Sequence, residues 1–226
     1  MPAKEPHPVP TQAIERLRQG NETFQAGSID TMRAVVIRRA QVAAGQHPIA
    51  AVLSCADSRV PPELVFNQGL GDIFVVRTAG AVPDQAVLGS LEYAVEHLHV
   101  PVVLVMGHLS CGAVKAAMET PPPVKPDPAG LNLERILMAI RPSLKQLPVQ
   151  GDRWENAVYA TVEQNIADVV RLSPVLAQAG RSGHVTFLGA VYELESGKVN
   201  FSAPVVFRPR PGHLAAPATA SLEGRK

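Results

Sequence analysis

The chain lacks most of the features that announce a secreted, membrane-bound or nucleic-acid-binding protein. It has two cysteines in 226 residues, and one potential pair in a chain of this size is weak evidence for a disulfide-stabilised secreted protein. Its formal net charge is +1, so composition indicates no surface for nucleic acid or an anionic membrane. No apolar run reaches the roughly 18–20 residues that a membrane-spanning helix needs. We therefore expect a reduced, cytoplasmic protein with neither nucleic acid nor membrane as a partner.

What the chain does contain is enough apolar sequence for a sizeable core. Hydrophobic residues make up 46% and charged residues 18%, and this length suits one α/β domain, which we expect over residues 11–207. Residues 1–10 hold four prolines, and residues 208–226 are rich in proline and alanine. We expect a flexible N-terminal arm and a flexible tail there. The first residues contain no apolar, signal-like segment, which disfavours secretion.

Three aliphatic runs, at residues 49–54, 73–76 and 101–106, show no polar alternation. Such runs are typical of parallel strands covered on both faces, and residues 88–98 between the last two predict a crossover helix. The sequence thus predicts an α/β fold, with a mainly parallel central β-sheet flanked by helices. The other expected elements are helices at 11–25 (broken at Gly20-Asn21), 31–44, 131–146 and 153–172, a proline-rich loop at 120–128, and hairpin-like C-terminal strands at 185–194 and 199–202.

Both cysteines stand where an apolar run gives way to polar residues. Cys55 opens Cys-Ala-Asp-Ser-Arg, and Cys111 closes a His-Leu-Ser-Cys segment that begins at His108. Parallel strands end at one edge of a sheet, so these two segments can converge although they are far apart in sequence. Two thiolates and an imidazole favour zinc and leave a fourth position vacant, as catalytic sites do. Either cysteine alone reads more simply as a small core residue; the combination with His108 predicts a metal site.

Asp57 and Arg59 follow Cys55 at alternate positions, so in an extended segment all three side chains face one side. Taken alone, an ordinary ion pair explains them. Beside a metal, the arginine would hold the carboxylate off the ion and keep it ionised, so that it can only accept hydrogen bonds. We expect such a carboxylate to orient metal-bound hydroxide toward an electrophile.

These motifs, together with several others, resemble the β-class carbonic anhydrases over roughly residues 12–205. The shared segments include Cys-x-Asp-x-Arg from Cys55, Gln-Gly-Leu-Gly-Asp from Gln68 and Gly-His-x-x-Cys-Gly-Ala-Val from Gly107. The resemblance implies a lyase, carbonate dehydratase, which reversibly hydrates carbon dioxide to bicarbonate and a proton by zinc-bound hydroxide. It also implies one Zn²⁺ per chain and an intertwined homodimer, often paired into a homotetramer.

The resemblance further assigns roles to individual residues. The zinc ligands fall on Cys55, His108 and Cys111, and the catalytic pair on Asp57 and Arg59. Carbon dioxide is small and apolar, so it suits an aromatic wall with one or two donors. The positions implied for its binding, partly across a dimer interface, are Gln46, Phe74, Tyr93 and the backbone amide of Gly112. His97, four residues after Tyr93, matches a proton-relay position.

One departure from the family pattern concerns regulation by bicarbonate. In some bacterial members a tryptophan, an arginine and a tyrosine hold bicarbonate while the aspartate closes onto the metal. Arg77 and Tyr192 match two of those positions, but Val52 stands where the tryptophan would be. We therefore expect a site that is open at neutral pH.

Three alternatives remain open at the level of sequence. One is a related zinc hydrolase of carbon disulfide or carbonyl sulfide on the same scaffold, which side-by-side assays would separate. The second is a non-catalytic zinc-binding regulatory protein, in which four protein ligands would complete the site. The third is a redox sensor that uses Cys55 and Cys111 as a dithiol, which thiol titration in the presence of zinc would reveal.

Overall fold

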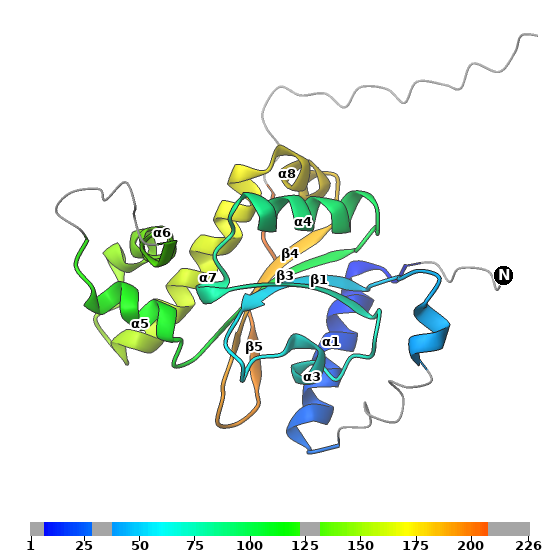
Figure 1. The fold of residues 1–226 in the computed structure, drawn as a ribbon, viewed down its shortest axis with the longest axis horizontal. Helices are drawn as coiled ribbons and strands as arrows, with labels where there is room; N and C mark the ends of the chain where they lie inside the picture. The colour runs from blue at the N-terminus through cyan, green and yellow to red at the C-terminus, as the bar shows by residue number, and fades with distance from the viewer. Residues whose placement is uncertain (1–6, 29–37, 123–131, 208–226) are drawn as a thin grey trace, which may run out of the picture.

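The computed structural model describes residues 7–28, 38–122 and 132–207. A five-stranded sheet with strand order β2-β1-β3-β4-β5 forms the centre of the fold (Figure 1). Neighbouring strands among the first four are parallel, and the last pair is antiparallel, which confirms the predicted mainly parallel sheet with a C-terminal hairpin. The strands are β1 (Ala50–Cys55), β2 (Ile73–Thr78), β3 (Val102–His108), β4 (Thr186–Tyr192) and β5 (Val199–Phe201).

Helices cover both faces of this sheet, and the side chains of its strands alternate between two cores. Leu53 and Val105 pack on the side of α4, α7 and α8, whereas Val52 and Leu104 pack on the side of α1 and α3 (Figure 1). This two-sided burial is why the strands read as continuous apolar runs. The helices are α1 (Pro10–Gln25), α3 (Pro62–Val65), α4 (Gln85–Glu96), α5 (Gly112–Glu119), α6 (Asn132–Ile140), α7 (Arg153–Leu172) and α8 (Pro174–Arg181), with 3₁₀ turns η1 (Ala79–Ala81) and η2 (Arg141–Gln146).

The predicted break at Gly20-Asn21 is wrong, because α1 is continuous through both residues. A Cβ on Gly20 would lie 1.8 Å from the backbone oxygen of Phe66, so glycine here allows close packing of α1 rather than a turn. The buried Asn21 side chain donates to the carbonyls of Val65 and Gly197 and accepts from the amide of Val199. Tertiary contacts therefore override the weak helix propensity of the two residues.

Other predicted elements agree with the structure in part. The helix expected at 131–146 is α6 followed by η2, because Pro142 has no N–H and its ring clashes with the preceding α-helical turn. Residues 38–42 are helical, but most of the helix expected at 31–44 lies outside the described residues. So do the tail, much of the N-terminal arm and much of the loop at 120–128. Short helices α3, α5 and α8 were not anticipated. Among the described residues, no helix has both the length and the apolarity to cross a bilayer.

Candidate metal and catalytic site

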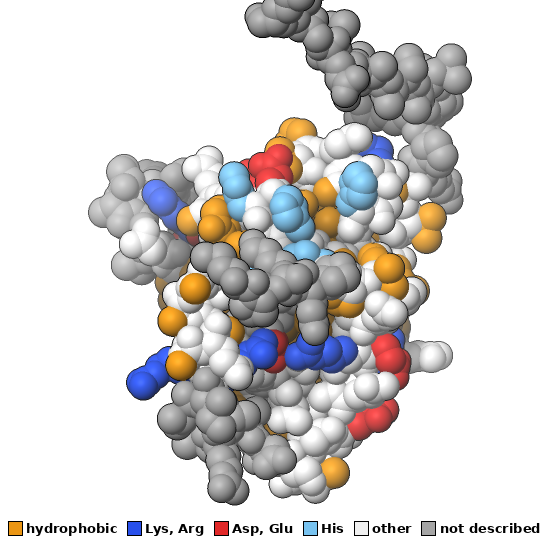
Figure 2. Space-filling model, turned by 90° about the vertical axis from the view of Figure 1, so that its right-hand side faces the viewer, with side chains coloured by type: hydrophobic (Ala, Val, Ile, Leu, Met, Phe, Trp, Pro, Cys, Tyr) orange, Lys and Arg blue, Asp and Glu red, His pale blue; other side chains and the backbone are white. Residues whose placement is uncertain are grey.

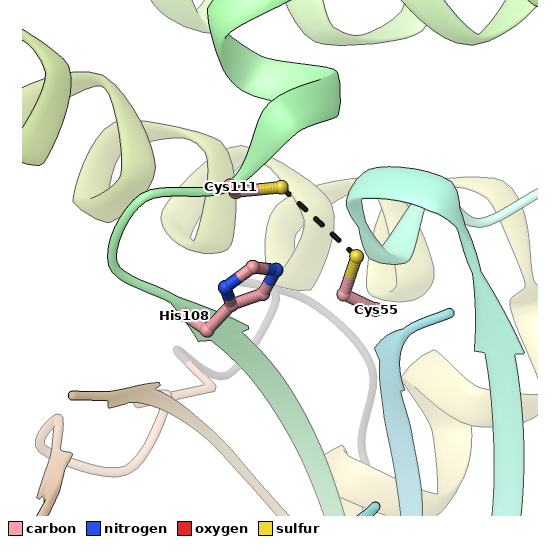
Figure 3. A group of neighbouring side chains, drawn as sticks. All are labelled: Cys55, His108 and Cys111. Atoms are coloured by element: carbon pink, nitrogen blue, oxygen red, sulfur yellow. Dashed lines mark hydrogen bonds between the residues drawn. The ribbon is translucent and has the colours of Figure 1, made fainter. Parts of the chain in front are cut away.

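The carboxyl ends of two neighbouring strands bring the three predicted metal ligands together (Figure 3). Cys55 ends β1, His108 ends β3, and Cys111 lies immediately before α5. The two sulfur atoms are 4.0 Å apart, and the ligand atoms of all three residues lie within 4.8 Å of one another. All three side chains are buried. The predicted convergence of the two cysteine segments is therefore confirmed.

A tight turn after β3 makes this convergence possible. Ser110 has φ 59°, in the left-handed region that few residues other than glycine adopt, and it reverses the chain between His108 and Cys111. The amide of Leu109 donates to the carbonyl of Tyr192 on β4 at 2.9 Å, which ties the turn to the sheet. The turn thus directs both side chains toward the end of β1.

The protonation of His108 suits metal binding. Its Nδ1 lies 2.9 Å from the carbonyl oxygen of Leu109, and because a carbonyl can only accept, Nδ1 must carry the proton. In the neutral ring this tautomer leaves the lone pair on Nε2, which is buried and has no hydrogen-bond partner. A buried acceptor left without a donor is costly unless a cation or a water meets it. A nitrogen lone pair facing two sulfur atoms is a donor set that fits zinc.

The surroundings of Cys55 favour a thiolate. The proton shared with Cys111 lowers the pKa of Cys55 most, and His108 lowers it further. The backbone amides of Gly80 and Asp57 donate to Cys55 Sγ at 3.4 and 3.5 Å. The hydrogen bond between the two sulfur atoms, together with burial, raises the pKa of Cys111. Two sulfurs in one buried pocket resist a second negative charge, and a divalent cation is the group that offsets it.

Asp57 and Arg59 form a two-pronged ion pair at the mouth of this group. Arg59 Nε donates to Asp57 Oδ1 at 2.9 Å, and its terminal nitrogen donates to Oδ2 at 2.7 Å. These bonds hold the pKa of the Asp57 carboxyl well below its usual range. Asp57 Oδ2 also lies 3.8 Å from His108 Nε2. An ionised, acceptor-only carboxylate therefore faces the metal-binding atoms.

Two further residues position this site, and sequence analysis missed both of these roles. Arg77 on β2 donates to the backbone carbonyls of Cys55 and Asp57 at 3.0 and 2.5 Å, which fixes the segment after β1. Trp154, in the first turn of α7, donates its indole N–H to the carbonyl of Cys111 at 3.1 Å. It is the only tryptophan in the chain, but nothing in the sequence links it to Cys111.

Of the other predicted site residues, only Gly112 lies beside the ligand group of its own chain, because it is the first residue of α5 and directly follows Cys111. Phe74 pairs with Ala51, four residues before Cys55, which places it about 13 Å away along the sheet. Tyr93 packs against Phe74 with ring centroids 6.2 Å apart, and His97 stacks on Tyr93 at 5.1 Å. Gln46 precedes β1 and so lies toward the same amino-terminal edge.

Comparison with known proteins agrees with this architecture. The family model for carbonic anhydrase matches residues 50–199. Carbonic anhydrase 2 of Mycobacterium tuberculosis is 39% identical over 199 residues, which cover 85% of this chain and 93% of that protein. The β-carbonic anhydrase of Coccomyxa, solved with acetazolamide, gives a TM-score of 0.65 at 26% identity, covering 86% of this chain and 84% of that one. A tetrameric β-carbonic anhydrase from Sordaria macrospora shares the fold, with a TM-score of 0.63 at 19% identity over 86% and 100% of the two chains.

Proposed function

The chain belongs to the β-carbonic anhydrase family, and from that premise we propose which residues carry out the reaction. The protein is a zinc lyase that reversibly hydrates carbon dioxide to bicarbonate and a proton. We assign its zinc ligands to Cys55, His108 and Cys111. The observation that carries this assignment is the buried cluster of two sulfurs and an unpartnered His108 Nε2, all within 4.8 Å of one another.

Zinc, when bound, supplies a Lewis acid that makes water acidic enough to react near neutral pH. Asp57 orients the attacking water, because an ionised carboxylate accepts a hydrogen bond from it and leaves its lone pair directed at carbon. Arg59 keeps Asp57 ionised and holds both carboxylate oxygens in place. This pairing supports a site that is open at neutral pH, since the carboxylate is engaged by Arg59. The proton released in the reaction passes to buffer.

Gln46, Phe74 and Tyr93 form the carbon dioxide pocket of a second protomer in this proposal, and Gly112 contributes its amide to its own site. Phe74 and Tyr93 pack together at the far end of the sheet from Cys55, so a homodimer that faces this edge toward the partner's zinc would complete both sites. Tyr93 is 47% exposed in the isolated chain, which leaves it available to a partner. His97, stacked on Tyr93, is then placed to relay protons from the same pocket. A homotetramer would pair two such dimers.

Replacing Asp57 or Arg59 by alanine tests the assignment of the catalytic pair. We expect both variants to keep zinc but to lose turnover by on the order of 100-fold, since orientation of the reacting water is lost. Stopped-flow carbon dioxide hydration, with metal content measured on the same samples, provides the readout. Arg171→Ala is a matched control, because Arg171 is an exposed arginine that also pairs with an aspartate, Asp168, on α7. This variant should hydrate carbon dioxide at the wild-type rate.

Wild-type rates in either Asp57→Ala or Arg59→Ala would reduce this pair to a structural one. Assays with carbonyl sulfide and carbon disulfide on the same samples distinguish the alternative substrates. We also propose a cytoplasmic location, because two reduced thiols used as metal ligands suit a reducing compartment. Cell fractionation would test it.

A further inference from the structure

A buried asparagine on α7 is connected to the metal ligand Cys55 through the 3₁₀ turn η1. Figure 2 shows charged and histidine side chains on one face of the molecule, where water can satisfy their hydrogen bonds. Asn165, by contrast, is 2% exposed, so its side-chain amide needs partners within the protein. Its Nδ2 donates to the backbone carbonyls of Gly80 and Ala81, each at 3.0 Å. The buried face of α7 thus holds a turn that is 84 and 85 residues away in sequence.

The turn that Asn165 contacts has a strained backbone. Gly80 has φ 69° and Ala81 has φ 54°, so two successive residues lie in the left-handed region, which alanine adopts only at a cost. The hydroxyl of Thr78 closes the same turn by donating to the carbonyl of Val82 at 2.9 Å. A backbone conformation that its own residues disfavour persists only when the surrounding structure fixes it. The two hydrogen bonds from Asn165 supply part of that constraint.

The same turn presents a hydrogen-bond donor to the metal site. The amide of Gly80 donates to Cys55 Sγ at 3.4 Å, and backbone N–H groups presented by a turn are suited to anions. A thiolate that accepts such a bond has part of its charge stabilised by the donor, so it donates less electron density to a metal. Asn165 is therefore linked to the sulfur of Cys55 through the backbone of Gly80.

We propose that Asn165 is a positioning residue for the zinc site, which acts on Cys55 through the backbone of Gly80. The inference rests on the proposed function in taking Cys55 as a zinc ligand. Groups that hydrogen-bond to metal ligands tune both metal affinity and the electronic character of the site. Without Asn165, the turn relaxes from the left-handed region and the amide of Gly80 moves away from Sγ. Zinc binding then weakens, and the thiolate donates more electron density to the ion.

Asn165→Ala tests the proposal, with Co²⁺ in place of zinc for one of the two measurements. We expect zinc affinity, measured by competition with a chelator, to fall by at least about tenfold. The thiolate-to-cobalt charge-transfer band should move to longer wavelength, because a sulfur that has lost a hydrogen bond gives up electron density more easily. Loss of packing alone would lower the melting temperature but would leave the band in place.

Asn21→Ala is the matched control. Asn21 is also a buried asparagine whose side chain donates to two backbone carbonyls. Its partners, Val65 and Gly197, come from α3 and from the loop between β4 and β5 rather than from the turn beside Cys55. This variant should lose stability, as Asn165→Ala does, but should keep the wild-type zinc affinity and cobalt spectrum.

Two further measurements keep the test decisive if Asn165→Ala folds poorly. Asn165→Leu retains the side-chain volume without a donor and should show the same band shift. In wild-type protein loaded with ¹¹³Cd, the amide proton of Gly80 should show a scalar coupling to the metal through Sγ, a measurement that needs no variant. The proposal is overturned if this coupling is absent, or if the cobalt band of the folded Asn165 variants matches that of Asn21→Ala. A wild-type cobalt protein without any thiolate charge-transfer band would instead contradict the proposed zinc ligands.

Discussion

Two inactive variants should restore activity when they assemble together if, as we propose, each carbon dioxide site combines residues from two chains. The argument is one of distance. Phe74 lies four residues from the level of Cys55 along paired strands, a separation of about 13 Å that a phenylalanine ring does not span. Phe74 therefore does not reach the ligand group of its own chain, and Tyr93 packs beside Phe74 with ring centroids 6.2 Å apart.

The test pairs Asp57→Ala, which disables the metal end, with the double variant Phe74→Ala/Tyr93→Ala, which disables the pocket end. In a mixed dimer, one site combines both defects and the other contains none. Random assortment makes half of the dimers mixed, so the co-expressed preparation should recover about a quarter of wild-type activity. The measurement is stopped-flow hydration on separately purified and on co-expressed proteins, with size-exclusion chromatography and light scattering to establish assembly.

Activity of the mixture no higher than that of its parents would place pocket and metal in one chain and refute the reasoning. Full activity of the Phe74→Ala/Tyr93→Ala parent would also refute it, since those side chains would then contribute nothing to the reaction. Mixing the parents after purification, without subunit exchange, is the matched control. That mixture should remain inactive.

Two further predictions concern residues whose roles the structure, but not the sequence, showed. Trp154→Phe keeps an aromatic ring beside Lys115 but removes the hydrogen bond to the Cys111 carbonyl, which is worth about 0.5–1.5 kcal/mol. Zinc should therefore dissociate between about two- and tenfold faster, as measured by trapping the released ion with a chelator. An unchanged dissociation rate would contradict a positioning role for Trp154. Gly20→Ala should destabilise the protein by about 3 kcal/mol or more in urea unfolding, because its Cβ meets the Phe66 backbone. Gly89→Ala, in open space on α4, should instead stabilise it by up to about 1 kcal/mol, and equal effects of the two changes would refute the packing argument.

Hydrophobic patterns in the sequence predicted those strands and helices whose conformation depends mainly on neighbouring residues. Unbroken aliphatic runs predicted the buried strands. Apolar residues at helical spacing, from Trp154 to Val169, predicted α7. Errors arose where distant contacts decided the outcome. Gly20 and Asn21 read as a break, yet α1 continues because Phe66, Val65 and Gly197 provide the contacts that hold it.

By itself, the sequence determined the chemistry available to this protein: two thiols and an imidazole for a metal, followed by an aspartate and an arginine at alternate positions. Residue type and short-range spacing suffice for that, because ligand preference and local geometry are properties of neighbouring residues. Only the tertiary structure decided that Trp154 and Arg77 hold the backbone of the ligand residues. It also decided that Phe74 lies at the opposite end of the sheet from the ligand group of its own chain, with Tyr93 packed against it. Such contacts join segments tens of residues apart, and their positions follow from strand order and register, which no local pattern encodes.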